Sequence, residues 1–562
     1  MNTPSKHGKA ASPRTKYNAR RRAILRRRFV SQFCVATLLA LAAGTSLTQG
    51  VTDLPGRIIP SDVAVVSLGE TPTSMPDAAT SSPTQLEPSA QPSLTVTKTP
   101  ILAPTHTATA TLEPSATPTN TPTVTHTPDP KASPEPPILY YAQAGDTLPV
   151  VAKRFNVSPE EITSSGPIPE TGFINPNQVL FIPRRLGDTT PSTQLMPDSE
   201  VVYSPSVAGF DIAAFLKDAG GYASAQSDAA EIIRKAALNN SIHPRILVGL
   251  LEYQSHWVFG QPTTLAETNY PMGDYDVKKQ YLSAQVSWAI DQLSIGYYHW
   301  RDGSLTSLTF PNGETLRLAP DLNAGTVAVQ YLFAQLYNRE EWSGKLYDDD
   351  SFITRYEEIF GNPWLSAQTV EPMLPSTLTQ PELELPFIPG QLWSFSGGPH
   401  AAWNGEGARA ALDFAPGSLE SGCVRSNTWA TAVATGQIVR SETGIIVLDL
   451  DGDGREETGW AVLYLHVATE GRVPVGKWVS VGDPIGHPSC EGGVATGTHI
   501  HIARKYNGEW VLADGPLSFD LSGWQAHAGE AIYKGTLTKD GKTVTANTVG
   551  SIETNIRRED SE

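Results

Sequence analysis

The sequence predicts a multidomain protein with a small α/β module, an all-α domain and a C-terminal, mainly antiparallel β domain over residues 386–540. Three observations lead to this fold class. The chain has 562 residues, which is more than one hydrophobic core can organise. Apolar residues recur with helical spacing in its middle part. From about residue 386 this helical pattern ends, and short runs of alternating apolar and polar residues, separated by glycine-rich turns, take its place.

The N-terminal segment 1–50 has the pattern of an export signal. Ten of the first 28 residues are Lys or Arg and none is acidic, and Phe29–Ala43 is a mostly apolar run. This run is shorter than the ~20 residues that span a membrane, and it matches the apolar part of a signal peptide. The segment is therefore either a cleaved signal peptide or an uncleaved signal anchor. In both cases we expect the rest of the chain to be secreted, in the cell wall or in the periplasm.

Residues 51–137 are predicted to form a disordered linker. From Thr71 to Pro137, 39 of 67 residues are Ser, Thr or Pro and none is aromatic, so this stretch cannot bury enough apolar surface to fold. The chain beyond its first 28 residues is strongly acidic, with 31 basic residues against 58 acidic ones. Such a surface repels phosphate backbones, which argues against nucleic acid as a partner.

A small α/β module is predicted over residues 138–185. A strand begins at its start, Asp146 or Thr147 is expected to cap the helix that follows, a second short helix begins at Ser158, and a strand closes the module. These features and the Gly-Asp-Thr-Leu turn resemble a LysM module. The resemblance implies binding of N-acetylglucosamine-containing glycans such as peptidoglycan. The alternative is a degenerate module that serves as a spacer.

An all-α domain is predicted over residues 205–375, with helical periodicity between residues 229 and 257. The segment from Ser241 to Trp257 resembles the catalytic helix of lysozyme-like lytic transglycosylases. In that family the general acid is a Glu directly before a Ser, and here Gln254 occupies its place. An amide cannot donate the proton that glycosidic cleavage needs. We therefore expect a domain that has lost cleavage and retains, at most, glycan binding.

The C-terminal β domain contains six of the twelve histidines. His499 and His501 flank one isoleucine on a predicted strand, so their side chains share one face. On its own this pair is either a solvent-facing pattern or part of a metal site. His400 and Asp413 add an imidazole and a carboxylate, which are donors that zinc favours. His466 adds a third imidazole on a separate predicted strand.

Together these five residues resemble the active site of the lysostaphin-like zinc endopeptidases. The thirteen-residue step from His400 to Asp413 resembles the β-lytic and staphylolysin branch of that family. The resemblance implies one zinc ion per chain, held by His400, Asp413 and His501. It also implies that His466 and His499 flank the reacting water and the oxyanion, with either histidine as the base. The implied substrate is the peptide part of peptidoglycan.

The remaining cysteines and the chain end carry two further predictions. Cys423 and Cys490 are the cysteines outside the export segment, and we predict a disulfide between them. Residues 541–562 are predicted to be a disordered tail.

An acidic run at Asp449, Asp451 and Asp453 resembles the start of a calcium-binding loop. The twelfth position is Trp460, however, so the bidentate glutamate of such a loop is missing. A polar hairpin turn is the preferred interpretation, with a calcium site as the alternative.

The sequence leaves three functions to compare. The favoured one is a zinc metalloendopeptidase that acts on peptidoglycan. The second is a non-catalytic peptidoglycan-binding scaffold or a regulator of wall hydrolases, and the complete set of five site residues argues against it. The third is glycan cleavage by the middle domain, and Gln254 argues against it.

Overall fold

The computed structural model describes residues 136–403 and 405–559. The predicted export segment 1–50 and nearly all of the predicted linker 51–137 lie outside these residues. Within the described part of the chain, no helix is both long enough and apolar enough to span a bilayer. This part combines helices with antiparallel sheets, as the sequence predicts.

The first module is a three-stranded antiparallel sheet with one α-helix against it. β3 lies between β1 and β2, and Phe155, Leu180 and Ile182 are buried in a core of its own. Its elements are β1 (Ile138–Tyr141), α2 (Leu148–Phe155), the 3-10 turn η1 (Pro159–Glu161), β2 (Thr163–Ser164) and β3 (Val179–Ile182).

The predicted position of the cap of helix α2 is confirmed at Thr147, but the predicted side-chain hydrogen bond is wrong. Thr147 is the N-cap residue, but its side chain makes no capping hydrogen bond. Asp146 is buried and accepts hydrogen bonds from the Tyr140 hydroxyl at 2.5 Å and the Gln143 amide at 2.7 Å. Arg154 donates to it at 2.7 Å. Because a buried carboxylate needs a cationic partner, Asp146 pairs with Arg154 instead of with the open end of the helix.

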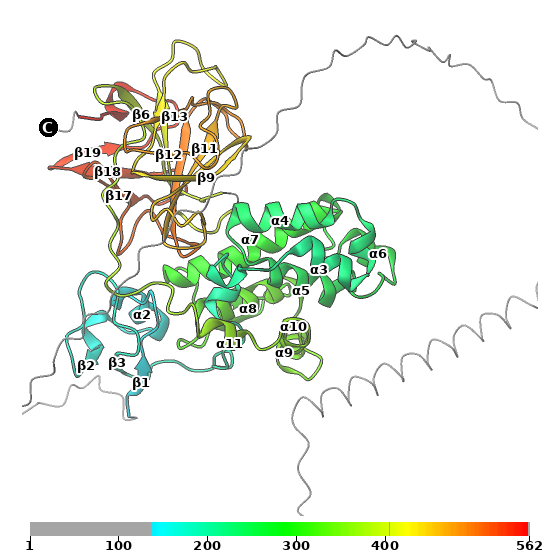
Figure 1. Cartoon of the computed structure of the whole chain (residues 1–562). Coiled ribbons are helices and arrows are strands. Elements are labelled where there is room, and N and C mark those ends of the chain that lie inside the picture. The colour runs from blue at the N-terminus through cyan, green and yellow to red at the C-terminus, as the bar shows by residue number, and fades with distance from the viewer. Residues whose placement is uncertain (1–135, 404, 560–562) are drawn as a thin grey trace, which may run out of the picture. The chain divides into compact units, whose positions relative to one another are not determined.

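The middle region is mainly helical and is drawn in green in Figure 1, with α7 packed against α8 and α4. Its helices are α3 (Ile212–Ala219), α4 (Ala229–Asn240), α5 (Pro244–Ser255), α6 (Leu265–Asn269), α7 (Leu282–Arg301), α8 (Ala324–Leu336), α9 (Arg339–Tyr347), α10 (Phe352–Phe360) and α11 (Pro363–Ala367). Its 3-10 turns are η2 (Asp198–Glu200), η3 (Pro205–Val207), η4 (Tyr222–Ala225) and η5 (Val277–Lys279).

The sequence analysis predicted an all-α domain here, and this prediction is wrong. A hairpin of β4 (Ser307–Thr309) and β5 (Thr315–Arg317) lies between α7 and α8. Gly313 between the two strands has a φ of 83°, a left-handed conformation that glycine adopts without strain. Gly313 therefore allows the chain to reverse direction between β4 and β5 and to form a hairpin between the two helices.

The C-terminal region contains a large antiparallel sheet and a smaller one, coloured yellow to red in Figure 1. The large sheet has the order β12-β9-β10-β11-β14-β7-β6-β20, with β15 beside β14. Its strands are β6 (Leu392–His400), β7 (Ala411–Pro416), β9 (Gly436–Glu442), β10 (Gly444–Asp449), β11 (Trp460–Val467), β12 (Trp478–Val479), β14 (Ile500–Tyr506), β15 (Glu509–Trp510) and β20 (Asn555–Arg557). The smaller sheet consists of β16 (Asp520–Leu521), β17 (Trp524–Ala528), β18 (Gly535–Lys539) and β19 (Lys542–Thr545), and β8 (Ala430–Thr431) pairs with β13 (Pro484–Gly486).

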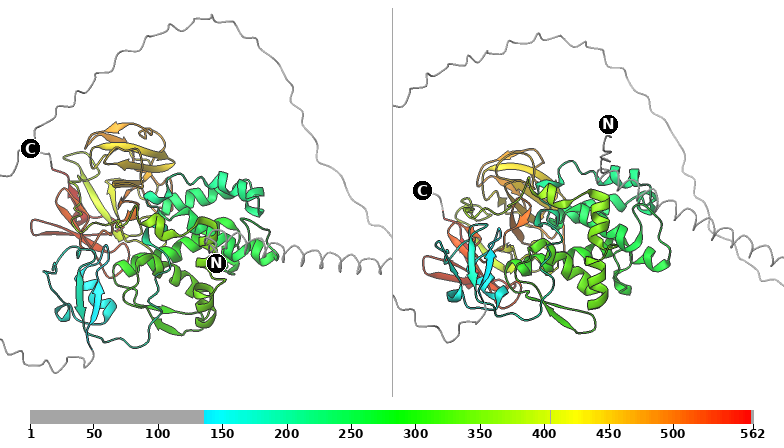
Figure 2. Two further views of the ribbon diagram at one scale, coloured as in Figure 1. Left: turned by 60° about the horizontal axis from the view of Figure 1, so that its bottom comes forward. Right: turned by 90° about the horizontal axis from the view of Figure 1, so that it is seen from below.

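The large sheet is buried on both faces. In β14, Ile500 and Ile502 enter a core shared with the smaller sheet, whereas Ala503 belongs to the core of the helical region. Trp510 also donates a hydrogen bond to the Asn240 carbonyl at the end of α4, at 3.1 Å. Because side chains alternate along a strand, His501 lies on the same face as Ala503. The helical region therefore covers the face of the sheet that carries His501; Figure 2 gives two further views of these helices and strands.

The predicted disordered tail is wrong for the residues that the structure describes. β19 pairs with β18, and β20 forms an edge of the large sheet beside β6. Ile556 is 1% exposed, and buried Arg558 donates to the Phe387 carbonyl at 2.9 Å. Strand pairing with a segment far away in the sequence orders this polar stretch, and local composition gives no sign of such pairing.

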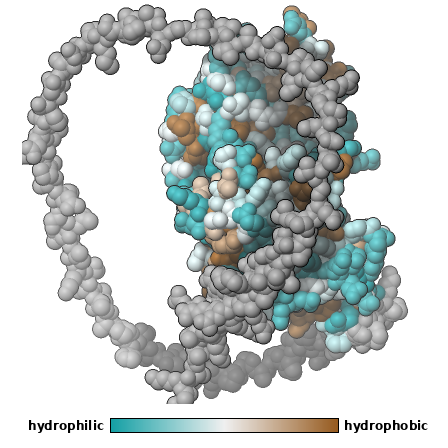
Figure 3. All heavy atoms as spheres, turned by 90° about the vertical axis from the view of Figure 1, so that its right-hand side faces the viewer, coloured by the Kyte–Doolittle hydropathy of each residue, from teal (hydrophilic) through white to brown (hydrophobic). Residues whose placement is uncertain are grey.

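One face of the molecule is shown in Figure 3. Where described residues are visible there, hydrophobic side chains form small patches among hydrophilic ones. Scattered apolar residues of this kind are normal on a protein surface. We therefore look for the functional site in the buried clusters of the structure.

Candidate active site

Three adjacent strands of the large sheet bring His400, Asp413 and His501 together. His400 is the last residue of β6, Asp413 lies in β7 and His501 lies in β14. β7 is the middle strand of the three, and His501 is directly opposite Asp413 in the ladder. The order of the strands thus joins two histidines that are 101 positions apart.

The three donor atoms form a nearly regular triangle. His400 Nε2 lies 3.0 Å from His501 Nδ1, and each of these nitrogens lies 3.2 Å from Asp413 Oδ1. Tetrahedral donors at ~2.0–2.1 Å from zinc are about 3.3 Å apart, so the triangle has the size that such an ion requires. The three residues are only 2–6% exposed.

The outer ring nitrogens fix the tautomers of both histidines. His400 Nδ1 lies 2.8 Å from the Gly398 carbonyl, and His501 Nε2 lies 2.9 Å from the Ala402 carbonyl. Because a carbonyl only accepts hydrogen bonds, these nitrogens carry the protons and the inner nitrogens keep their lone pairs. Asp413 Oδ1 is buried without a hydrogen-bond partner. Three electron-rich atoms facing one another fit a metal cation between them.

The electrostatics of the cluster favours the ligand forms of Asp413 and His501, whereas it favours the protonated form of His400 as long as Asp413 is its charged neighbour. Burial raises the pKa of Asp413, but the charges of His400 and His499 lower it well below its usual value. Burial lowers the pKa of His501. Burial also opposes protonation of His400, yet the charge of Asp413 raises the pKa of this ring. Burial, together with His499 and His501, lowers the pKa of His466 to about 4.

Two further histidines, the predicted His466 and His499, lie beside the triangle. His466 is the extra residue of a β-bulge in β11 and has a φ of 62°. Its ring lies 4.5 Å from that of His499, whose Nε2 lies 3.7 Å from Asp413 Oδ1. His466 Nδ1 donates to the Glu491 carbonyl at 3.0 Å, and His499 Nδ1 donates to the Gly497 carbonyl at 2.8 Å. Both rings therefore keep the Nε2 lone pair, which can accept a proton.

Tyr533 is a residue of this site that the sequence analysis missed. Its ring stacks on His400 with centroids 4.1 Å apart and planes 25° apart, and its carbonyl accepts the Gly398 amide at 3.0 Å. Burial and the charge of Asp413 raise the pKa of Tyr533, so its hydroxyl stays protonated and can donate. The sequence signal was one tyrosine in a glycine-flanked turn, which is too common to single out.

The disulfide and the acidic turn lie elsewhere in the C-terminal region. Cys423 and Cys490 form a disulfide with Cα atoms 5.7 Å apart, as predicted. Asp449 accepts three backbone amides of its own turn, at 2.9–3.2 Å, which is the behaviour of a polar hairpin turn. The carboxylates of Asp449, Asp451 and Asp453 lie within 4.8 Å of one another, so the calcium alternative stays a hypothesis.

Gln254 lies on α5 in the helical region, far in sequence from the metal-ligand triangle. Its side-chain oxygen accepts a hydrogen bond from the Tyr337 hydroxyl at 2.7 Å. The nearby carboxylate, Glu252, is 2% exposed, pairs with Arg355 at 2.5 Å and accepts the Val258 amide at 3.1 Å. Glu252 thus stabilises the bundle, and neither residue is arranged as a glycosidase acid.

Comparison with known proteins shows which family the chain is similar to. The family model described as "LasA, N-terminal domain" matches residues 194–373, which is the helical region. Protease LasA of Pseudomonas aeruginosa (strain UCBPP-PA14) is 25% identical over 345 residues, which cover 58% of this chain and 77% of the relative. The chain is similar to the LasA-like metallopeptidases. The LysM and lysozyme-like assignments stay predictions.

A second relative is similar to this LasA-like metallopeptidase over a shorter stretch. Beta-lytic metalloendopeptidase of Achromobacter lyticus is 27% identical over 172 residues, which cover 28% of this chain and 43% of the relative. Among solved structures, the deep-sea metalloprotease pseudoalterin is 24% identical, covers 30% of this chain and 96% of its own, and has a TM-score of 0.25. The LasA-like chain is thus a metalloendopeptidase, and the His-Asp-His triangle is its candidate metal centre.

Proposed function

We propose that this LasA-like enzyme is an exported zinc endopeptidase that hydrolyses cross-links or stem peptides of peptidoglycan. The observation that carries the proposal is the triangle of lone pairs at His400, Asp413 and His501, whose donor atoms lie 3.0–3.2 Å apart. The similarity to protease LasA and to beta-lytic metalloendopeptidase supports the class of reaction. Export rests on the pattern of residues 1–50.

His400, Asp413 and His501 would hold one zinc ion per chain. Two neutral imidazoles and one carboxylate match the three protein ligands of catalytic zinc sites. When bound, zinc supplies a Lewis acid that polarises carbonyls and lowers the pKa of water to ~7. The carbonyls of Gly398 and Ala402 hold the two rings in the tautomers that this ligand set requires.

His466 and His499 are proposed to move the proton. Nε2 of one ring takes the proton from the attacking water and passes it to the leaving amine. The other ring can donate to the developing oxyanion only when it is protonated, because its neutral form has its single proton on Nδ1, against a carbonyl. Either histidine can serve as the base in this arrangement.

Peptidoglycan is the proposed partner of two parts of the chain. The peptide would enter the site of the C-terminal region, and the 138–185 module, by its LysM-like sequence, would bind the glycan. Two weak sites on one chain raise the effective concentration of the enzyme at the polymer. This arrangement needs no further contact between the two sites.

The test is digestion of purified peptidoglycan, followed by mass analysis of the products. We expect new free amino groups that disappear with a chelator and return with zinc, and that His400→Ala abolishes. His466→Ala and His499→Ala should retain zinc and lower kcat by roughly 10²–10⁴-fold. His487→Ala, whose ring Nδ1 contacts the Thr428 carbonyl outside the triangle, is the matched control.

The other outcomes contradict the proposal in different ways. Anhydro-sugar ends in the products would mean that the helical region cleaves glycan. Unchanged peptidoglycan with zinc-loaded protein would favour the non-catalytic scaffold.

A further inference from the structure

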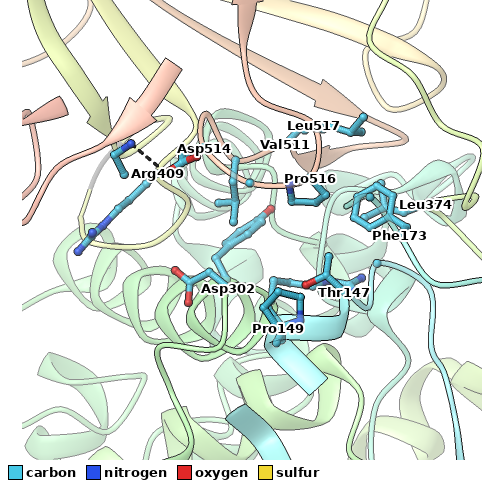
Figure 4. A pocket seen from close by; sticks show the side chains of 18 of the residues that line it. Thr147, Pro149, Phe173, Asp302, Leu374, Arg409, Val511, Asp514, Pro516 and Leu517 are labelled. Atoms are coloured by element: carbon cyan, nitrogen blue, oxygen red, sulfur yellow. Dashed lines mark hydrogen bonds between the residues drawn. The ribbon is translucent and has the colours of Figure 1, made fainter. Parts of the chain in front are cut away.

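A cavity of about 460 Å³ lies where three regions of the chain meet, and the proposed peptidase mechanism does not use it. One side comes from the first module, one from the end of α7, and one from residues 511–517 between β15 and β16. Figure 4 shows the cavity from close by. Cavities of roughly 300–1,000 Å³ with apolar walls and a few polar groups are typical of small-molecule sites.

Apolar side chains from different regions form much of the lining. Phe173 and Leu374 lie together, and Pro516 and Leu517 approach them from the C-terminal region (Figure 4). Pro149 of the first module adds another ring. One aromatic ring and several aliphatic groups of this kind suit the C–H faces of a ring-shaped ligand.

Two carboxylates at the cavity each keep one oxygen for a ligand. Asp302 uses one oxygen to accept the Ser304 amide at 2.7 Å, and Asp514 uses one to accept the Ala528 amide at 2.9 Å. Their second oxygens have no hydrogen-bond partner within residues 136–403 and 405–559. Such oxygens accept hydrogen bonds from hydroxyl groups.

The charges around the cavity nearly cancel. Arg301 already donates to Glu509 at 3.1 Å, so this pair is neutral as a unit. The other charged residues of the lining are two cations and three anions, namely Lys153, Arg409, Glu170, Asp302 and Asp514. This balance disfavours a strongly anionic ligand and favours a neutral one that is rich in hydroxyl groups.

We infer that this cavity binds a neutral saccharide and that residues 511–517 of the C-terminal region form one wall of the site. The inference rests on the proposed function, because the glycan strand is the part of peptidoglycan that carries the peptide. Pro399 lines the cavity and is followed directly by the metal ligand His400. Both residues belong to β6, so we expect a sugar bound in the cavity to hold its attached peptide near the metal centre, and the enzyme to select peptides that are still attached to sugar.

Calorimetric titration of the full chain with tetra-N-acetylchitotetraose tests the binding site. Pro516→Trp fills the cavity from the C-terminal wall, and Phe173→Ala removes a ring from the opposite module. Each should raise Kd at least about tenfold. Val549→Trp, at a residue that is 88% exposed, should leave Kd within about twofold. Pro516→Ala, expected to raise Kd about threefold, replaces Pro516→Trp if the melting temperature shows misfolding.

Two results of this titration would overturn the inference. One is the absence of saturable binding to the unmodified chain up to about 10 mM saccharide. The other is loss of binding in Phe173→Ala with unchanged binding in both Pro516 variants, because the site would then belong to the first module alone.

A cleavage assay separates this inference from the proposed function. For the unmodified enzyme we expect kcat/KM to be roughly tenfold higher on a sugar-linked peptide than on the same peptide without sugar. Pro516→Trp should reduce that ratio towards one. Equal values for both substrates in the unmodified enzyme would overturn the selectivity. Cleavage of neither substrate would contradict the proposed peptidase instead, whatever the titration shows.

Discussion

The four histidines of the site make the same kind of hydrogen bond: each donates a ring N–H to a backbone carbonyl at 2.8–3.0 Å. The carbonyl decides which nitrogen faces the centre, so His501 presents Nδ1 whereas the other three present Nε2. Backbone carbonyls are held by the sheet and its turns, and they position a ring more rigidly than a mobile side chain does. The site therefore depends on backbone positions as much as on the histidines themselves.

Gly397 makes room for the carboxylate of the triangle, and this gives a residue-scale prediction. A Cβ at Gly397 would lie 2.3 Å from Asp413 Oδ2, so Gly397→Ala must displace the ligand. We expect the affinity for zinc to fall roughly 10–100-fold, the range seen when support of a metal ligand is lost. Competition with a fluorescent zinc chelator measures it.

Gly417→Ala is the matched control, because a Cβ at Gly417 would meet no atom within 4 Å. It should bind zinc like the unmodified chain. If Gly397→Ala also bound zinc with unchanged affinity, the position of Asp413 would not matter for metal binding.

At the scale of elements, the turn after β13 holds His466 in its unusual conformation. The Ser489 amide and hydroxyl donate to the His466 carbonyl at 2.7 Å and 2.9 Å, and the Glu491 carbonyl accepts the ring proton. The Cys423–Cys490 disulfide lies in the middle of this turn and ties it to the segment after β7. The disulfide thus supports a residue at a positive φ, which is costly without such support.

Replacing both cysteines by serine should therefore affect activity and stability without removing the metal. We expect kcat to fall about tenfold with unchanged zinc content, because His466 loses its fixed orientation. The free energy of unfolding should fall by about 2–4 kcal/mol, since the bond closes a loop with a sequence separation of 67. Kinetics, zinc analysis and urea unfolding measure the three quantities.

Ser421→Ala, an exposed change in the same segment, should alter neither kcat nor stability. A double cysteine variant with full kcat would show that the turn keeps its shape without the disulfide.

The sequence predicts more of the candidate site than of the fold. Residue types mark a set of imidazoles and one carboxylate, and the resemblance to the lysostaphin-like endopeptidases selects His400, Asp413 and His501 from that set. The partner carbonyls of Gly398 and Ala402 leave no trace in residue type. The position of Tyr533 was hidden for a similar reason, since it depends on a turn that contacts β6 from another sheet.

The pairing of strands could not be predicted from the sequence, for a different physical reason. Alternation predicts a strand but not its neighbour, so β20 beside β6 and the order of β7 between β6 and β14 follow only from tertiary packing. Asp146 failed as a predicted cap because a buried arginine competes for it, and burial is a property of the folded chain.

For the whole molecule, a buried cluster around Arg301 ties its regions together. Arg301 donates to Asp198 at 2.9 Å, to Glu509 of β15 at 3.1 Å and to the Ala144 carbonyl of the first module. Glu509 is 2% exposed. One side chain at the end of α7 thus joins the helical region, the C-terminal sheet and the first module.

Arg301→Met should destabilise the chain by about 3–5 kcal/mol, because it leaves the charge of Glu509 buried without its partner. Urea unfolding measures this loss. Arg339→Met breaks the ion pair with Glu314, in which both side chains are more than a third exposed, and should cost less than about 1 kcal/mol. Equal effects of the two changes would mean that Arg301 does not join the regions energetically.

The same cluster makes stability depend on pH through Glu371. Burial, with the charge of Asp198, raises the pKa of Glu371 from its ordinary 4.5 to about 7, and the side chain accepts the Ser199 amide at 2.9 Å. Between these two pH values the folded chain holds a proton that the unfolded chain has released, so stability falls as pH rises from about 4.5 to about 7. Glu371→Gln removes this titration.

We therefore expect the melting temperature to drop between pH 5 and pH 8 by roughly 2–4 °C less in Glu371→Gln than in the unmodified chain. Glu382→Gln, at an exposed position of the same connecting segment, should follow the unmodified chain. Calorimetry at several pH values measures these differences. A larger drop in melting temperature in Glu371→Gln than in the unmodified chain would contradict the prediction. It would mean that the folded chain prefers the charged carboxylate, because the charge of Arg301 outweighs both burial and the charge of Asp198.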